Sequence, residues 1–167
     1  RLWKGVGLIA LLAGAAMVIG AFAGSRDPLR PLAGLVAGNS EAVPAVKFER
    51  VQSLAQLDAR LAAAGRSVML DFYADWCVSC KEMERFTFSD ERVQARMANV
   101  TLLQVDVTQN TAEDRALLQR FRLFGPPGII FFDRSGKEIP GLRVIGFQDA
   151  ARFAQTLDRA TAGPGQI

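Results

Sequence analysis

The pattern of apolar and polar positions divides the chain into three parts and a short tail. Residues 5–24 form an apolar run without a charged residue, and a helix of that length crosses a bilayer core of roughly 30 Å. Residues 25–46 contain three prolines and no sustained periodicity, which is typical of a linker. We therefore predict a transmembrane helix within residues 1–24, a linker over 25–46, a folded domain over 47–160 and a tail over 161–167.

The apolar run has a second interpretation. Basic residues precede it and Ala21-Phe22-Ala23 ends it, as in an export signal with its cleavage site. The length of the run and the absence of an initiator Met favour a membrane span, which we expect to be the last span of a longer protein. Small residues four apart, such as Ala10 and Gly14, suit a span inside a helix bundle, although a lone anchor fits the pattern almost as well.

The folded part alternates between strand-like runs and helical spacing, which predicts an α/β domain. The predicted strands are residues 46–51, 68–74, 100–107, 129–132 and 143–146. Helices are predicted after the capping residues Ser53, Thr111 and Asp149, from Cys77 to Phe88, and from Ser89. The last two strands are joined by a turn at 133–136 and form a hairpin. The fold class is therefore a mixed central sheet flanked by helices on both faces.

Composition excludes several functions. The chain has no histidine and two cysteines, which rules out His-based catalysis and leaves too few ligands for an ordinary zinc site. The formal net charge is +3, and from residue 47 onward 16 Lys and Arg stand against 15 Asp and Glu. Charges of both signs are interspersed, so we expect no nucleic-acid partner. We also expect no metal and no bound cofactor.

The two cysteines, Cys77 and Cys80, follow directly on a buried strand at a spacing that closes into a disulfide on the first turn of a helix. A thiolate is the attacking species in disulfide exchange, and a helix N-terminus stabilises its negative charge. Cys77 at that terminus is the predicted nucleophile. Cys80, one turn further on the same face, is the predicted resolving thiol.

Two acidic residues are candidates for assisting this pair. Asp71 lies in the otherwise apolar strand before Cys77, where burial raises a carboxyl pKa into the range of a proton carrier. We expect it to accept the proton of Cys80, although a carboxylate satisfied by backbone donors is the alternative. Glu84 lies one helical turn beyond Cys80, where it either tunes that thiol or is a solvated helix residue.

The segment Gly125-Pro126-Pro127-Gly128 precedes a predicted core strand, where a proline is normally excluded. A cis bond before Pro127 explains its presence and leaves backbone groups free for an incoming peptide; an ordinary trans loop is the alternative. Pro126, Pro127 and Trp76, which precedes Cys77, are the candidate substrate-contacting residues.

These residues resemble a known family. The run from Asp71 through Trp76-Cys77-Val-Ser-Cys80-Lys81, together with Pro127, is similar to the active-site region of the thioredoxin family. Further segments, including Thr87-Phe-Ser-Asp90 and Ile130-Phe-Phe-Asp133, resemble more closely the carboxy-terminal periplasmic domain of the DsbD family of membrane thiol:disulfide interchange proteins. The sequence departs from the family at Gly128, where Thr is usual after the cis-proline, and at Pro126 before it.

The resemblance implies a thioredoxin-like fold and a protein-disulfide reductase held at the bacterial inner membrane through residues 5–24, with its folded domain in the periplasm. It further implies an electron-donor domain in the same membrane protein and a periplasmic thiol-disulfide partner domain. By the same resemblance, Asp71 and Glu84 fall on acidic positions near the active cysteines. Two alternatives remain open: a single-span thioredoxin-like protein for cytochrome c maturation or disulfide oxidation, and a non-catalytic adaptor with a structural disulfide.

Overall fold

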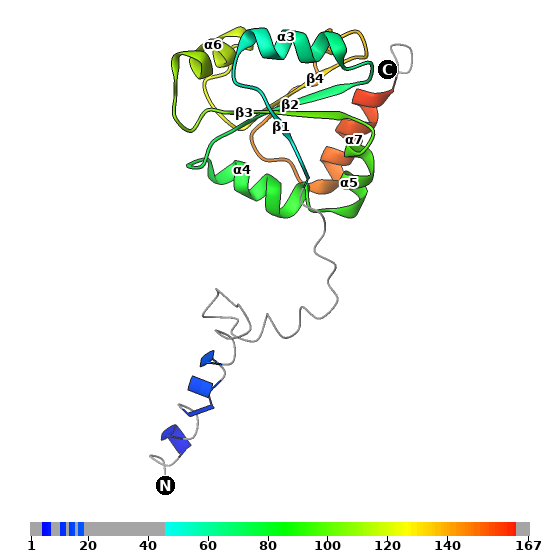
Figure 1. Ribbon diagram of the computed structural model, residues 1–167. Helices are drawn as coiled ribbons and strands as arrows, with labels where there is room; N and C mark the ends of the chain where they lie inside the picture. Colours follow the sequence, from blue (N-terminus) through cyan, green and yellow to red (C-terminus); the bar gives the residue numbers. More distant parts are fainter. Residues whose placement is uncertain (1–4, 8–10, 13, 16, 19–45, 163–167) are drawn as a thin grey trace. The chain divides into compact units, whose positions relative to one another are not determined.

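The computed structural model of the protein describes residues 5–7, 11–12, 14–15, 17–18 and 46–162 (Figure 1). The chain divides into two compact units, Arg1–Pro44 and Ala45–Ile167. The described residues of the first unit are helical. No helix in the described part of the chain is long and apolar enough to cross a membrane. Most of the predicted span, the predicted linker up to residue 45 and residues 163–167 of the tail lie outside the described residues.

The second unit is built on a five-stranded sheet. Its strands are β1 (Glu49–Arg50), β2 (Val68–Tyr73), β3 (Thr101–Asp106), β4 (Gly128–Phe132) and β5 (Val144–Ile145). Their order is β1-β3-β2-β4-β5, with β1 and β2 parallel to β3, and β4 antiparallel to both β2 and β5. The prediction of a mixed sheet that ends in a hairpin is therefore confirmed.

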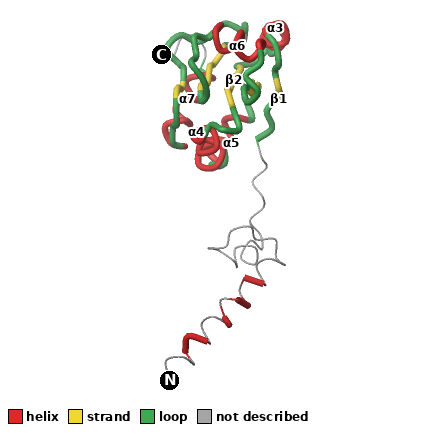
Figure 2. The backbone as a smooth tube through the Cα atoms, turned by 90° about the vertical axis from the view of Figure 1, so that its left-hand side faces the viewer, coloured by secondary structure: helices red, strands yellow, loops and turns green. Residues whose placement is uncertain are grey.

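Helices cover both faces of this sheet. They are α3 (Leu54–Ala63), α4 (Val78–Glu82), the π-helical turn η1 (Met83–Thr87), α5 (Glu91–Met97), α6 (Ala112–Arg120) and α7 (Ala150–Thr161). Helices α3 and α6 lie on one face, and α4, α5 and α7 lie on the other (Figures 1 and 2). This three-layer arrangement is the predicted one.

The helix starts follow from local capping chemistry. Ser53, Thr111 and Asp149 cap α3, α6 and α7 as predicted, each accepting a hydrogen bond from a first-turn backbone N–H. The prediction for α5 is one residue early. Asp90 is its N-cap, because the Ser89 hydroxyl instead donates to the carbonyl oxygen of Arg85 at 2.6 Å.

The two edge strands are shorter than predicted. The apolar runs 46–51 and 143–146 each pair over two residues only, as β1 and β5. Hydrophobic pattern marks the residues that face the core, whereas a strand is defined by backbone pairing. An edge strand pairs on one side and ends where its neighbour diverges.

The sheet separates two apolar clusters. One cluster contains Leu57 and Leu61 of α3, Leu117 of α6 and the β2 residues Leu70 and Phe72. The other contains the β2 residue Met69 together with buried residues of η1, α5 and α7, among them Met83, Val93, Met97, Phe153 and Leu157. Strand β2 is buried along its whole length, so the segment that follows it starts from a rigid base.

Candidate active site

The two cysteines lie where β2 gives way to α4. They form a disulfide with an S–S distance of 2.03 Å and a Cα–Cα distance of 5.3 Å. Cys77 is the N-cap of α4, and its Sγ accepts a hydrogen bond from the backbone N–H of Cys80 at 3.1 Å. The prediction that both cysteines lie on the first turn of a helix is confirmed. An amide directed at Sγ of Cys77 is the kind of contact that stabilises a thiolate there.

The side chains on either side of Cys77 are apolar and face solvent. Trp76 is 62% exposed and Val78 is 71% exposed, while Cys77 and Cys80 are both buried. Exposed large apolar side chains next to a reactive group are typical of a surface that another molecule covers. Trp76, the residue that the sequence nominates for substrate contact, is one of these exposed side chains, and its role stays a prediction.

Asp71 is a buried carboxyl in the middle of β2, with 5% of its surface exposed. Burial raises its pKa from 3.8 to about 7, against the opposing effect of a hydrogen bond from Gln104. The negative charge of Glu84 raises the pKa of Asp71 further. The structure thus brings together the two acidic residues that the sequence singled out, although Glu84 itself is exposed.

Gln104 is the site residue that sequence reasoning missed. Its Nε2 donates to Oδ2 of Asp71 at 2.7 Å, because β2 and β3 pair with Asp71 opposite Gln104. The register between two strands separated by a helix cannot be read from sequence. The available signal was a lone amide within the apolar run of β3, which matches a lone carboxyl within β2.

Orientation places Asp71 on the face of β2 that the active-site helix covers. Successive strand residues point to opposite faces, so Asp71 shares a face with Met69, which packs in the cluster that contains Met83 of η1. The preceding and following residues, Leu70 and Phe72, belong to the opposite cluster. Asp71 is therefore directed toward the layer of η1, which carries Glu84, whereas Cys77 and Cys80, beyond the end of β2, pack with the opposite cluster.

The proline segment borders the same end of β2. The peptide bond between Pro126 and Pro127 is cis, which decides between the cis bond and the trans loop that the sequence left open. Gly128 pairs with Phe72 of β2, which places both prolines beside the cysteine turn. The carbonyl oxygen of Pro127 accepts a hydrogen bond from the N–H of Gly146 at 3.2 Å, so the segment is held to β5 as well.

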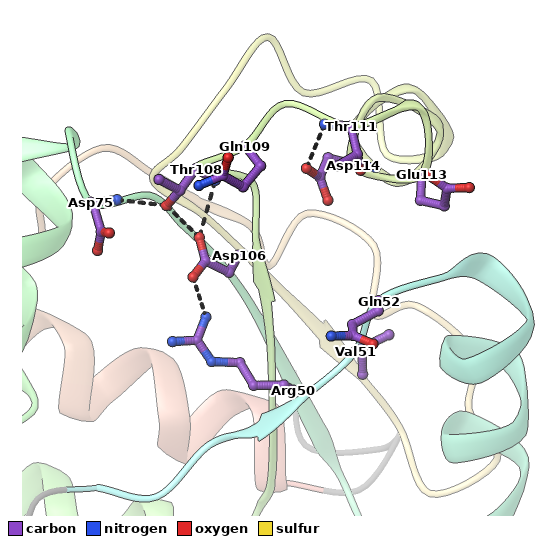
Figure 3. Close-up of a pocket in the computed structure, with 10 residues that line it drawn as sticks. All are labelled: Arg50, Val51, Gln52, Asp75, Asp106, Thr108, Gln109, Thr111, Glu113 and Asp114. Atoms are coloured by element: carbon purple, nitrogen blue, oxygen red, sulfur yellow. Dashed lines mark hydrogen bonds and ion pairs between the residues drawn. The ribbon is translucent and has the colours of Figure 1, made fainter.

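The turn before Cys77 is held by hydrogen bonds and an ion pair among residues that line a polar pocket of about 610 Å³ (Figure 3). The backbone N–H of Asp75 donates to Oγ1 of Thr108 at 2.9 Å, and the Thr108 hydroxyl donates to Asp106. Asp106 forms an ion pair with Arg50 at 2.9 Å. This chain of contacts fixes the backbone two residues before the disulfide.

No group of three or more His, Cys, Asp or Glu side chains in the described residues is arranged to hold a metal ion. The chemistry that the site offers is that of the sulfur pair, a nearby buried carboxyl and an apolar rim.

Comparison with known proteins agrees with this geometry. The sequence model of the thioredoxin-like domain matches residues 55–161, and the chain belongs to the thioredoxin-like family. The C-terminal domain of DsbD from Neisseria meningitidis, solved in its oxidised form, is 35% identical with a TM-score of 0.57; the match covers 67% of this chain and 99% of that domain. A thioredoxin from Thermus thermophilus shares the fold at 24% identity and a TM-score of 0.56, over 72% of this chain and 92% of the thioredoxin.

Among curated sequences, the chain is similar to the thiol:disulfide interchange protein DsbD. It is 55% identical to DsbD of Ralstonia nicotianae over 166 residues, which is 96% of this chain and 27% of that protein. It is 53% identical to DsbD of Yersinia pestis over 128 residues, which is 75% of this chain and 22% of that protein. The chain therefore spans about a quarter of the length of the curated relatives it matches.

Proposed function

We propose that the domain is a protein-disulfide reductase that exchanges its Cys77/Cys80 pair with disulfides of other proteins. The observation that carries the proposal is the cysteine pair at the start of α4, where the Cys80 N–H donates to Sγ of Cys77. The similarity to proteins named thiol:disulfide interchange protein supports the same chemistry.

The reaction proceeds in two sulfur transfers. In the reduced domain, the Cys77 thiolate attacks one sulfur of a partner disulfide, forms a mixed disulfide and releases the other partner sulfur as a thiolate. Cys80 loses its proton and attacks Sγ of Cys77, which restores the Cys77–Cys80 disulfide and releases the second partner sulfur. Two electrons have then passed from the domain to the partner.

Asp71 is the proposed acceptor for the Cys80 proton. With a pKa of about 7, the carboxyl takes up and gives back a proton near neutral pH with little cost in either direction. Gln104 fixes the carboxyl by its hydrogen bond, and Glu84 makes the ionised form less favourable. With no histidine in the chain, a buried carboxyl whose pKa lies near 7 has the acidity that this task requires.

We further propose that the domain works in the bacterial periplasm, held at the inner membrane, as one station of a relay. Its electrons come from a membrane domain of the same parent protein, and it passes them to a periplasmic thiol-disulfide partner domain. Support comes from the relatives, which are about four times as long as this chain, and from the apolar run over residues 5–24.

A purely structural disulfide is the less favoured function. Its stabilisation grows with the length of the loop it closes, and this disulfide joins residues only three apart. A bridge of that kind adds little stability. The exposed apolar side chains of Trp76 and Val78 beside it are not needed for a purely structural disulfide.

The test is to trap the intermediate. Replacing the resolving thiol, Cys80→Ala, should leave the mixed disulfide between Cys77 and a partner unresolved, so a covalent adduct should accumulate. We would mix the reduced variant with the oxidised periplasmic domain of a DsbD relative and follow the adduct on a non-reducing gel.

The matched control is Cys77→Ala, which leaves Cys80 as the only thiol. We expect at least tenfold less adduct from it, because Cys77 holds the helix N-cap position that stabilises a thiolate. Equal adduct from the two variants would contradict the assignment of the nucleophile, and no adduct from either would contradict the exchange function.

A further inference from the structure

One exposed side chain near the cysteines has no role in the chemistry described so far. Phe124 lies in the loop between α6 and β4 and is fully exposed, with a relative exposure of 110%. Single exposed apolar residues are common on protein surfaces. Phe124 differs from these because of how firmly its loop is held and where the loop lies.

The loop is fixed where it leaves α6. The N–H of Leu123 donates back to the carbonyl oxygen of Leu118 at 2.9 Å. The guanidinium of Arg143 donates to the carbonyl oxygen of Phe121 at 2.6 Å, which ties the end of α6 to the β5 side of the sheet. Phe124 therefore follows a backbone that is already ordered before any partner arrives.

The loop is also fixed where it enters β4. The side chain of Leu123 packs over Gly128, and its Cδ1 lies 2.8 Å from the place where a Cβ on Gly128 would be. Leu123 fills the space of the missing side chain and points inward, while its neighbour Phe124 points to solvent. Together with the hydrogen bond from Gly146 to Pro127, this contact holds the loop against the sheet.

The loop borders the reaction centre. Gly128 pairs with Phe72, and the Phe72 carbonyl oxygen lies 4.0 Å from Sγ of Cys80. Phe124 is three residues from Pro127, so the chain places their Cα atoms at most about 11 Å apart. A polypeptide that reaches the cysteines along the prolines comes within reach of Phe124.

The prolines limit what the backbone can offer to such a polypeptide. Neither Pro126 nor Pro127 has an amide hydrogen, and the Pro127 carbonyl already accepts from Gly146. A partner strand therefore gains few main-chain hydrogen bonds here, fewer than expected from the sequence, which predicted free backbone groups beside the cis bond. More of the binding energy must come from side chains. An aromatic side chain on an ordered backbone suits that purpose, because the loop itself loses little conformational freedom on binding.

We propose that Phe124 is an apolar anchor for the partner, and that the site prefers polypeptides in which an apolar side chain lies near the reactive cysteine. The inference rests on the proposed exchange function and adds a substrate preference to it. Phe124 is a specificity residue, not a member of the reacting group.

The preference can be measured with short synthetic peptides. Each carries one cysteine, blocked as a mixed disulfide with thionitrobenzoate, and either Leu or Ser at one flanking position. The reduced domain transfers two electrons to this disulfide, becomes oxidised at Cys77 and Cys80, and releases the peptide thiol and coloured thionitrobenzoate. We expect Leu to accelerate release about tenfold over Ser for at least one flanking position, and Phe124→Ala to abolish that difference.

Phe86→Ala is the matched control, because Phe86 is an exposed phenylalanine on η1; it should keep the preference for Leu. Phe124→Leu should retain part of it. The anchor is refuted if the unaltered chain shows no preference, if Phe124→Ala keeps it, or if Phe124→Ala slows the Leu and Ser peptides equally. A change of oligomeric state in Phe124→Ala by sedimentation, with the preference intact, would assign Phe124 to contacts between copies and also refute it.

The two proposals fail in different ways. If the unaltered chain releases no thionitrobenzoate from any peptide, the exchange function fails and the anchor fails with it. If release is rapid but independent of the flanking residue, the exchange function stands and the anchor alone is wrong.

Discussion

Asp71 carries a cost that the stability of the fold does not require. An apolar side chain at this buried position of β2 would need no hydrogen-bonding partner, whereas the carboxyl depends on Gln104 and still has a pKa of about 7. Desolvation therefore outweighs the hydrogen bond. The position makes physical sense if the carboxyl serves the chemistry of the neighbouring cysteines.

Stability should consequently fall as the pH rises. The unfolded chain loses the Asp71 proton near pH 4, whereas the folded domain keeps it until about pH 7, so the stabilising effect is complete below pH 4 and is lost as the pH rises through 7. The difference corresponds to roughly 4 kcal/mol. Asp71→Asn should flatten this dependence, as measured by urea unfolding of the oxidised domain between pH 4 and pH 8.

The control is Asp133→Asn. A hydrogen bond from Ser135 lowers the pKa of Asp133, so its contribution has the opposite sign and is lost as the pH falls. This variant should keep the loss of stability toward neutral pH. If Asp71→Asn retains the full pH dependence, or reduces a partner at the unaltered rate at every pH, the proposed proton carrier is wrong.

At this scale the sequence predicts the residues whose chemistry is conspicuous. Two cysteines and a carboxyl in an apolar strand stand out because their side chains differ from those around them. Gln104 and Phe124 were missed because their importance depends on strand register and on exposure. Both are properties of the folded chain and leave no local signature.

The helix after Cys77 contains a π-helical turn that its sequence pattern does not predict. The sequence predicts one helix to Phe88, and the structure adds a π-helical turn at Met83–Thr87, in which the Phe88 N–H bonds to the Met83 carbonyl oxygen. Sulfur of Met83 and the hydroxyl of Thr87 both contact the backbone of Gln148, before α7. These contacts join the active-site helix to the last helix.

The contact between Gly128 in β4 and Leu123 in the preceding loop predicts that substitutions at these two positions affect stability in a coupled way. A Thr at position 128 would place its Cβ against Leu123, so Gly128→Thr should destabilise the domain by about 1–3 kcal/mol. Adding Leu123→Ala should recover at least about 1 kcal/mol of that loss, because the two side chains compete for one space. Urea unfolding of the two single variants and the double variant measures the coupling.

Gly125→Ala is the control for this cycle. Nothing lies within 4 Å of a Cβ at that position, so the change should alter stability by less than about 0.5 kcal/mol. Additive effects of Gly128→Thr and Leu123→Ala would show that the two residues do not share a space.

The type and order of the helices and strands are predicted from the sequence far better than the residues at which they begin and end. Hydrophobic periodicity and capping residues identify each helix and strand, because both reflect local chemistry. The ends of β1 and β5 depend on where a neighbouring strand diverges. The π-helical turn contacts Gln148, just before α7 and more than sixty residues further along the chain.

For the molecule as a whole, redox chemistry and folding are linked. The folded domain and the unfolded chain each have a reduction potential for the Cys77/Cys80 pair. The difference between these two potentials, expressed as a free energy, equals the difference in folding stability between the oxidised and the reduced domain. The related Neisseria meningitidis domain has been solved in both oxidised and reduced forms. The direction of electron flow therefore depends on a free-energy difference between two folded states.

A reductase should be more stable when oxidised. We expect the potential of the Cys77/Cys80 pair to be more negative than that of glutathione, and the oxidised domain to resist urea more than the reduced one. For each 30 mV by which the potential of the folded domain lies below that of the unfolded chain, the oxidised domain should be about 1.4 kcal/mol more stable than the reduced one. A reduced form that is the more stable of the two would indicate an oxidant and contradict the proposed direction.

The short edges of the sheet bear on how copies of the domain meet in a crowded compartment. A long unpaired edge would invite strand-to-strand joining between molecules, which is the first step of fibre formation. Strands β1 and β5, which form the two edges, are only two residues long. Each edge of the sheet therefore offers only a short length of backbone to a strand of another copy.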